Sequence, residues 1–254
     1  MALFSDGVAC TIDDLTDQDS GLLDVAQTCG INVTTKMRLA HEDIASEIHL
    51  WLDRSRPSMD IAWVPSPRIE QVVTTPALRQ WEVMMALTLV YRDAYFSQLV
   101  DRYQAKWEEY SQLTRRAYER FVASGMGLVN HPVKQALPPI LGTVAGPQKG
   151  GSFYASIAWV NAAGQEGAAS IASSIMIGDG NLMTVSAGES PSGVAGFNVY
   201  AATDLNAMFR QNDTALPAGG SFTYVPNVVT DGQLPGTGQA PDFVRPMART
   251  ILRG

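Results

Sequence analysis

The chain has 254 residues, of which 46% are hydrophobic and 17% charged, and its formal net charge is −7. This length suffices for one large domain or two ordinary ones. The acidic balance argues against a protein that wraps nucleic acid, which needs a basic face. The two cysteines, Cys10 and Cys29, are too few for a disulfide framework.

The start of the chain, residues 1–10, lacks the basic-then-apolar pattern of a secretory signal peptide, so we expect reduced thiols and synthesis in a cytoplasm. No stretch approaches the roughly 20 apolar residues of a membrane span, and we expect no membrane insertion. Charge divides the chain: residues 1–135 contain 13 Lys/Arg and 18 Asp/Glu, and residues 136–254 contain 5 and 7, which together give the stated 18 and 25. This division predicts two different modules.

The first half shows helical spacing of apolar residues. Those from Leu15 to Cys29 predict one or two short helices that Gly30 ends. A second stripe, from Met37 to Leu52, predicts a long helix that Thr34 or Thr35 caps and that ends before Pro57.

Two further helices are predicted in this half. The Thr75-Pro76 pair is typical of a helix start, and residues 77–96 are apolar nearly all round, as in a central helix. Residues 98–124 predict a last helix with one apolar face, ended by Gly125 and Gly127.

The second half changes to strand patterns. After a Pro/Gly-rich connector over 137–151, residues 153–160 alternate with the period of two that a sheet imposes, and a turn follows at 161–164. Further strands are predicted over the ranges 169–177, 182–187, 196–201 and 221–225. The fold class predicted is therefore α+β in separate modules: an all-α helical bundle over 1–135 and an antiparallel β-sandwich over 136–236.

Residues 237–254 are predicted as a C-terminal tail. Arg245, Arg249 and Arg253 are four residues apart and stand beside Phe243, Met247, Ile251 and Leu252. If the segment is helical, it presents a basic and an apolar face; a frayed terminus with solubilising arginines is the alternative.

The spacing of the histidines in the sequence does not match that of a metal site. His41-Glu42 begins an HExxH motif, but Ala45 stands where the second histidine is required. His49 lies eight residues after His41, about 12 Å along a helix axis, which is too far for one ion. His131 precedes Pro132 and is expected in a loop.

Two other clusters have structural interpretations. The carboxylates of Asp13, Asp14, Asp17 and Asp19 are expected at a solvated helix start, favoured by the helix dipole, rather than in a calcium loop. The aromatic residues Trp81, Tyr103, Trp107 and Tyr110 have helical spacing and are expected in the core.

Catalytic signatures are missing from the sequence: we find no G-x-S-x-G elbow, P-loop or dinucleotide-binding glycine pattern. We therefore predict a protein that is not an enzyme, with no catalytic residues, no cofactor and no metal.

The order of elements resembles a known family. The segments Thr11-Ile12-Asp13-Asp14-Leu15, residues 21–26, residues 36–40 with Trp51-Leu52, and residues 99–107 resemble the head-to-tail adaptor (connector) proteins of tailed bacteriophages. Residues 153–167 and 196–200 are similar to the immunoglobulin- or fibronectin-III-like modules appended to phage structural proteins.

The resemblance implies a structural virion protein in the neck between head and tail, made in the host cytoplasm. Subunits would form a homo-oligomeric ring, typically a dodecamer, between the portal protein and a tail or nozzle protein. The ring would extend a channel through which DNA passes without specific binding, and the Ig-like module would point outward for attachment.

In that family an extended C-terminal segment commonly inserts into the portal. The portal-docking residues so implied are Phe243, Arg245, Met247, Arg249, Ile251, Leu252 and Arg253. Deletion of residues 242–254 is then expected to abolish portal binding and to leave thermal unfolding unchanged. The alternative hypothesis is a carbohydrate- or receptor-binding virion accessory protein whose helices only oligomerise.

Overall fold

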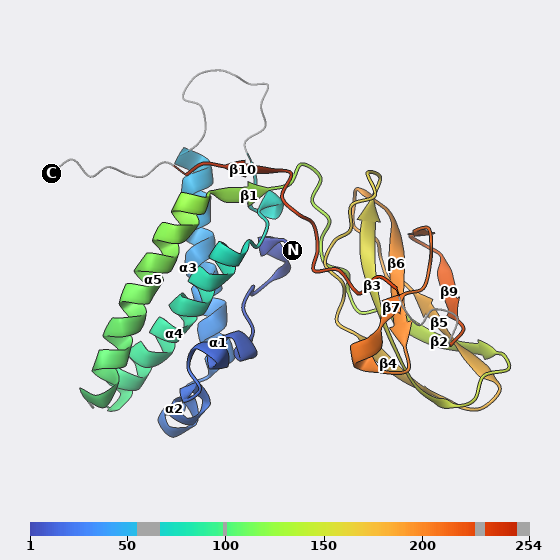
Figure 1. The fold of residues 1–254 in the computed structure, drawn as a ribbon, viewed down its shortest axis with the longest axis horizontal. Coiled ribbons are helices and arrows are strands. Elements are labelled where there is room, and N and C mark those ends of the chain that lie inside the picture. Colours follow the sequence, from blue (N-terminus) through green and yellow to red (C-terminus); the bar gives the residue numbers. More distant parts are fainter. Residues whose placement is uncertain (55–66, 99–100, 227–231, 248–254) are drawn as a thin grey trace, which may run out of the picture. The chain divides into compact units, whose positions relative to one another are not determined.

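The computed structural model describes residues 1–54, 67–98, 101–226 and 232–247, and the side chains of Arg54 and Gln98 are left undescribed. It confirms the predicted fold class, with helices before residue 125 and antiparallel sheets after it (Figure 1). The five α-helices of the described residues are α1 (Ile12–Gln18), α2 (Leu22–Cys29), α3 (Val33–Arg54), α4 (Pro76–Gln98) and α5 (Gln104–Ser124).

Ten strands and four short 3₁₀ turns complete the described secondary structure. The strands are β1 (Met126–Leu128), β2 (Ile140–Ala145), β3 (Gly151–Asn161), β4 (Ser173–Ile177), β5 (Asn181–Ser186), β6 (Val194–Ala202), β7 (Phe209–Arg210), β8 (Leu216–Pro217), β9 (Ser221–Tyr224) and β10 (Phe243–Arg245). The 3₁₀ turns are η1 (Phe4–Asp6), η2 (Ile69–Gln71), η3 (Asp101–Tyr103) and η4 (Leu205–Ala207).

The chain divides into two compact units, and each is built from two separate segments. A β unit contains residues 1–6 and 130–240, and a helical unit contains residues 7–129 and 241–254. The N-terminal segment is fixed within the β unit, where Leu3 and Phe4 are buried and the Asp6 carboxylate accepts the Gln135 N–H at 3.0 Å. The domain boundaries predicted above, at 135 and 236, stay a prediction.

The helical unit is organised around α4. This helix packs against both α3 and α5, and it also contacts α1 and α2. Its buried residues lie all round its circumference, including Trp81, Met84, Leu87 and Tyr91, which confirms the central helix expected from its apolar sequence. Figure 1 shows α3 and α5 running in the same direction, opposite to α4. No helix in the described residues is long and apolar enough to cross a lipid bilayer.

Local signals explain most helix ends. Gly30 ends α2 in the left-handed conformation (φ 66°), as predicted. Thr75 Oγ1 accepts the Leu78 N–H at 3.3 Å at the start of α4, also as predicted. The predicted cap of α3 is wrong, because the Asn32 side-chain oxygen accepts the Thr35 N–H at 3.0 Å and the helix already begins at Val33.

The last predicted helix is shorter than expected at its start. Asp101–Tyr103 form a 3₁₀ turn, and α5 begins at Gln104. Residues 99–100 lie outside the described part of the chain. Gly125 ends α5, and its N–H donates to the Phe121 carbonyl.

The β unit is a sandwich of two antiparallel sheets. One sheet has the order β2-β5-β9, and the other has the order β4-β3-β6-β7 with β8 also paired to β6. Residues from both sheets share one core, among them Phe153, Trp159, Val185, Val199 and Tyr224. This confirms the predicted sandwich, in which residues 153–160 belong to β3.

One prediction in this unit is wrong. The segment 137–151, expected to be a connector, contains β2, which pairs with β5 from Ile140↔Ser186 to Ala145↔Asn181. Pro138, Pro139 and Gly142 conceal the strand in the sequence, because proline and glycine usually interrupt strands. At the edge of a sheet their cost is low, since one side of the strand needs no ladder hydrogen bonds.

Candidate docking site

The C-terminal strand β10 is built into the helical unit. Phe243 pairs with Leu128 and Arg245 with Met126, which makes β10 the antiparallel neighbour of β1. On the other side of β1, the Val73 N–H donates to the Gly127 carbonyl at 3.0 Å and the Val129 N–H donates to Gln71 at 2.9 Å. β1 therefore lies between its strand partner β10 and an isolated antiparallel bridge from Val72 to Leu128.

Two glycines allow β10 to approach so closely. Gly125 has a φ of 79°, and a Cβ there would lie 2.7 Å from Val244 Cγ1 and 2.9 Å from the Arg245 carbonyl oxygen. At Gly127 a Cβ would lie 3.1 Å from both Pro241 and Thr75. Gly125 and Gly127, which were predicted to end the last helix, therefore also leave the space in which the C-terminal segment lies against β1.

The structure places only some of the predicted docking residues. Phe243 is 44% exposed and its neighbour Val244 is 54% exposed, whereas Arg245 and Met247 are half-buried. Arg249, Ile251, Leu252 and Arg253 lie outside the described residues. The segment 243–245 is a strand and not the start of a helix, because its backbone pairs with β1.

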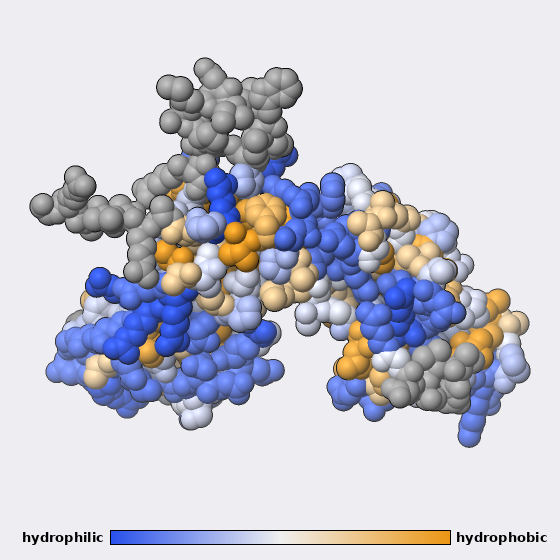
Figure 2. Space-filling view, turned by 45° about the horizontal axis from the view of Figure 1, so that its top comes forward, coloured by the Kyte–Doolittle hydropathy of each residue, from blue (hydrophilic) through white to orange (hydrophobic). Residues whose placement is uncertain are grey.

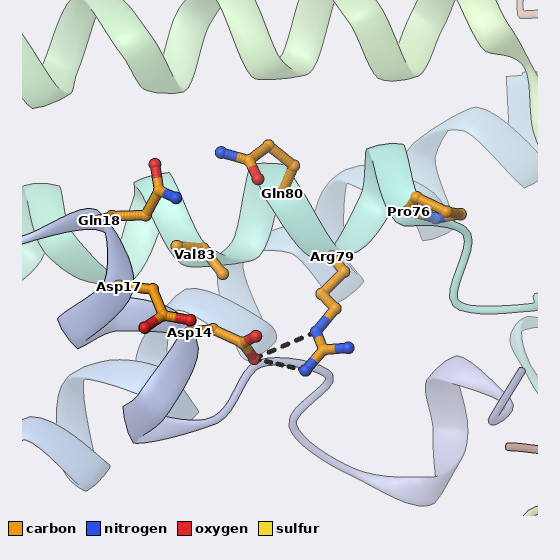
Figure 3. Close-up of a pocket in the computed structure, with 7 residues that line it drawn as sticks. All are labelled: Asp14, Asp17, Gln18, Pro76, Arg79, Gln80 and Val83. Carbon is orange, nitrogen blue, oxygen red and sulfur yellow. Dashed lines mark hydrogen bonds and ion pairs between the residues drawn. The ribbon is translucent and has the colours of Figure 1, made fainter.

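A small pocket lies between α1 and α4 (Figure 3). It has a volume of about 250 Å³ and is lined by Asp14, Asp17, Gln18, Pro76, Arg79, Gln80 and Val83. The Arg79 guanidinium donates to Asp14 Oδ2 from Nη2 at 2.6 Å and from Nε at 3.1 Å. Because the Arg79 guanidinium is already paired with Asp14, we interpret the pocket as part of the packing contact between α1 and α4.

The same carboxylate caps α1. Asp14 accepts the Thr11 N–H at 2.7 Å, and Thr11 Oγ1 accepts the Asp14 N–H at 3.2 Å, which is a complete capping box. Burial opposes ionisation of Asp14, but the hydrogen bonds from Thr11 and Arg79 outweigh it and hold the pKa of the carboxyl below its ordinary value.

Asp19 is the centre of a buried polar cluster, which corrects the expectation that it is solvated. It is only 9% exposed, and its Oδ2 accepts from Tyr91 at 2.7 Å, Tyr110 at 2.9 Å and the Lys106 ammonium at 3.0 Å. Its Oδ1 accepts the Gly21 N–H at 3.0 Å. The cluster ties the α1–α2 turn to α4 and α5.

The surroundings of Asp19 favour its charged form. Burial opposes ionisation, but hydrogen bonds from Tyr91, Lys106 and Tyr110 outweigh it, so the pKa of Asp19 is lowered. Burial and the Asp19 carboxylate together raise the pKa of Tyr91 and Tyr110, which therefore remain protonated donors.

A second buried carboxylate, Glu82, lies within α4 and is fully buried. Its Oε1 accepts the N–H groups of Ala9 at 2.7 Å and Cys10 at 3.3 Å, and its Oε2 lies 3.1 Å from His41 Nδ1. Burial, followed by the charge of Glu82, raises the pKa of the Cys10 thiol. A reactive cysteine needs a lowered pKa, so this cluster does not activate a nucleophile.

The three histidines lie in three different environments. His41 faces Glu82, and His49 is exposed on α3. His131 lies in a loop, as predicted, where its carbonyl accepts from Gln239 Nε2 at 2.9 Å. Within the described ranges, no group of three His, Cys, Asp or Glu residues could hold a metal ion.

The predicted aromatic core is largely confirmed. Trp81, Tyr103 and Tyr110 are buried, and Trp81 stacks on Phe121 with ring centroids 5.5 Å apart. Trp107 is half-buried and stacks on Tyr95.

The β unit contains a polar cluster that sequence analysis missed. The Glu166 carboxylate accepts from the Tyr200 hydroxyl and from Asn198 Nδ2 at 3.0 Å. Asn212 Nδ2 donates to Asn198 Oδ1 at 3.1 Å, and Asn212 Oδ1 accepts the Val199 N–H at 2.7 Å. These side chains satisfy one another and join β6 to the segments beside it.

Two larger hollows lie one in each unit. One, of about 510 Å³, belongs to the β unit and is lined by Asn130, His131, Pro132, Asn161, Ala162, Ala163, Ser192 and Gly193. The other, of about 480 Å³, belongs to the helical unit and lies beside Gly30, where Lys36 forms an ion pair with Asp93. Both are open and shallow surface features.

Comparison of the chain with protein-family models, with curated protein sequences and with solved structures finds no match.

Proposed function

We propose that this protein is a head-to-tail adaptor of a tailed bacteriophage virion and has no enzymatic role. In this proposal the helical unit forms a ring between the portal and a tail or nozzle protein, and the β unit serves for attachment. The proposal starts from the resemblance of the helical segments and includes assembly of the virion in the host cytoplasm.

The observation that supports it most is the attachment of β10 to the helical unit. The predicted docking residues begin with Phe243 and Arg245, which lie in this strand, and the strand belongs to the unit proposed to form the ring. Exposed Phe243 and Val244 give the strand an apolar surface, which a partner protein would cover.

The charge balance of the first half agrees with a DNA channel. Residues 1–135 contain 13 basic and 18 acidic residues. An acidic wall repels phosphate groups, so DNA passes along it without binding.

Electron microscopy of virion necks, combined with binding of purified protein to the portal of the same phage, tests the proposal. We expect density for the protein in the neck and a stable complex with the portal. A protein that is missing from virions and does not bind the portal would overturn the adaptor assignment.

Truncation at two positions separates docking from folding. We expect a chain ending at Arg245 to lose portal binding while its thermal unfolding stays the same. A chain ending at Ala240 also loses β10, so it should bind no portal and unfold at a lower temperature, because Met126 and Leu128 of β1 lose their strand partners. This revises the expectation that deletion from Asp242 leaves unfolding unchanged.

Unchanged portal binding by the chain ending at Arg245 would contradict the docking role of the tail. Co-sedimentation with portal measures binding, and differential scanning calorimetry measures unfolding. The alternative, a carbohydrate- or receptor-binding accessory protein, predicts glycan-array binding by the full-length protein that both truncations retain.

A further inference from the structure

α3 and α5 each expose a pair of like charges, and the sign differs between the two helices; the side of the helical unit seen in Figure 2 is mostly hydrophilic. On α3 the exposed residues Asp43 and Glu47 point outward, and on α5 the exposed residues Arg116 and Arg120 do so. Within the part of the chain that the structure describes, none of these four side chains has a hydrogen-bond or ion-pair partner.

Neighbouring charges on both helices are neutralised internally. Arg38 pairs with Glu42 within α3, and Arg115 pairs with Glu119 within α5 at 3.4 Å. Both are i, i+4 pairs on one helix face. Asp43 and Glu47 therefore remain as a negative pair on α3, and Arg116 and Arg120 remain as a positive pair in the C-terminal half of α5.

The spacing of the two pairs is the same. Asp43 and Glu47 are four residues apart, and so are Arg116 and Arg120, which separates each pair by about 6 Å along its helix axis. When α3 of one copy lies beside a parallel α5 of another, both arginines meet both carboxylates at once.

The fold gives these two pairs the same chain direction. α3 and α5 run in the same direction on either side of α4, against which both pack (Figure 1). Asp43 and Glu47 lie around the middle of α3, and Arg116 and Arg120 lie in the second half of α5.

We infer that copies of this chain associate head to tail, with the acidic face of α3 (Asp43, Glu47) against the basic face of α5 (Arg116, Arg120) of the next copy. A two-fold contact of either face with itself would bring like charges together. A contact between two different faces repeats from copy to copy, and it forms the proposed ring when the rotation between neighbouring copies closes. This inference rests on the proposed adaptor function and names its subunit contact.

Individual surface ion pairs are weak, so the ring depends on repetition. Each copy uses both faces, and closure of the ring adds one contact without a further association step. Assembly should weaken with salt, because the screening length falls from about 10 Å at 0.1 M to about 3 Å at 1 M.

Charge reversal tests the contact with the full-length protein alone. We expect the α5 variant, Arg116→Glu with Arg120→Glu, and the α3 variant, Asp43→Lys with Glu47→Lys, each to weaken self-association roughly tenfold to a hundredfold. The readout is the molar mass from light scattering after size-exclusion chromatography at low salt.

Two rescues distinguish the proposed contact from general loss of structure. The chain with all four reversals has complementary faces again and should assemble as the wild type does. An equimolar mixture of the α3 and α5 variants should form rings in which the two alternate, because each variant then meets an oppositely charged face.

A matched control changes the same charge elsewhere. Glu189→Lys with Asp213→Lys reverses two exposed carboxylates of the β unit and should assemble as the wild type does. Wild-type protein that remains monomeric at low salt, or single-face variants that assemble normally, would overturn the inference. Portal binding by such single-face variants would leave the adaptor function standing, so the two failures are distinguishable.

Discussion

Replacement of Asp19 by alanine should destabilise the helical unit by about 3 kcal/mol, because it leaves buried donors without an acceptor. Tyr91 and Tyr110 are 2% and 4% exposed, so their hydroxyls would lose their partner away from water. Lys106 would lose its carboxylate, although its side chain is 45% exposed and regains solvent. We expect the unfolding temperature to fall by about 10 °C.

Asp17→Ala is the matched control, since Asp17 is an exposed carboxylate two residues away. Its effect should stay within about 0.5 kcal/mol. Equal unfolding temperatures of the two variants would show that the Asp19 cluster adds nothing to stability.

The Asp19 cluster also predicts a pH dependence. Because the folded-state pKa of Asp19 is lowered, its contribution is fully present above the ordinary pKa of about 3.9. This contribution to the free energy of unfolding is lost as the pH falls through the folded-state pKa, because protonation of the Asp19 carboxylate weakens its charge-assisted hydrogen bonds. Acid titration of the unfolding temperature should therefore be steeper in the wild type than in Asp19→Ala.

Replacement of Glu82 by alanine should detach the segment around Cys10 from α4. The carboxylate accepts two backbone N–H groups there, and without it both are left unsatisfied in the interior. The expected cost is about 3 kcal/mol, with the loss concentrated at residues 7–11. Hydrogen exchange at the Ala9 and Cys10 amides measures this directly.

Thiol labelling gives a second readout of the Glu82 contact. In the wild type, Cys10 is 3% exposed and its pKa is raised, whereas Cys29 is half-buried and serves as an internal reference. We expect Glu82→Ala to raise the labelling rate of Cys10 at least about tenfold, as local opening becomes easier. Glu70→Ala removes an exposed carboxylate and should leave this rate unchanged. A Cys10 rate that Glu82→Ala does not alter would contradict the anchoring role.

Much of the fold follows from local patterns in the sequence. Apolar spacing located α3 and α4, and Gly30 and Thr75 marked helix ends that the structure confirms. Alternation over residues 153–160 located the central strand β3. In each case the signal lies within a few residues of the element that it predicts.

The missed features depend on partners distant in the sequence. β1 and β10 are short and acquire strand structure only by pairing across more than 100 residues. The assignment of residues 1–6 to the β unit has the same cause, because Asp6 meets Gln135.

Of the two buried carboxylates, Glu82 could have been recognised from the sequence. Glu82 is the only charged residue in the mostly apolar stretch 81–90, where a charge requires a partner. The identity of those partners, two backbone N–H groups more than 70 residues earlier, was not readable from the sequence. In the sequence, nothing distinguishes Asp19 from the acidic residues that precede it. Its burial results from the packing of α4 and α5 over its side chain.

The interleaving of the two units has a consequence for synthesis. Chains fold largely from the N-terminus as they leave the ribosome. Here residues 1–6 can pack only after the residues beyond position 130 have been made, and the helical unit receives β10 only after residues 130–240 of the β unit have been made. A chain that stops before residue 243 therefore cannot complete the helical unit, although all five of the described helices have already been synthesised.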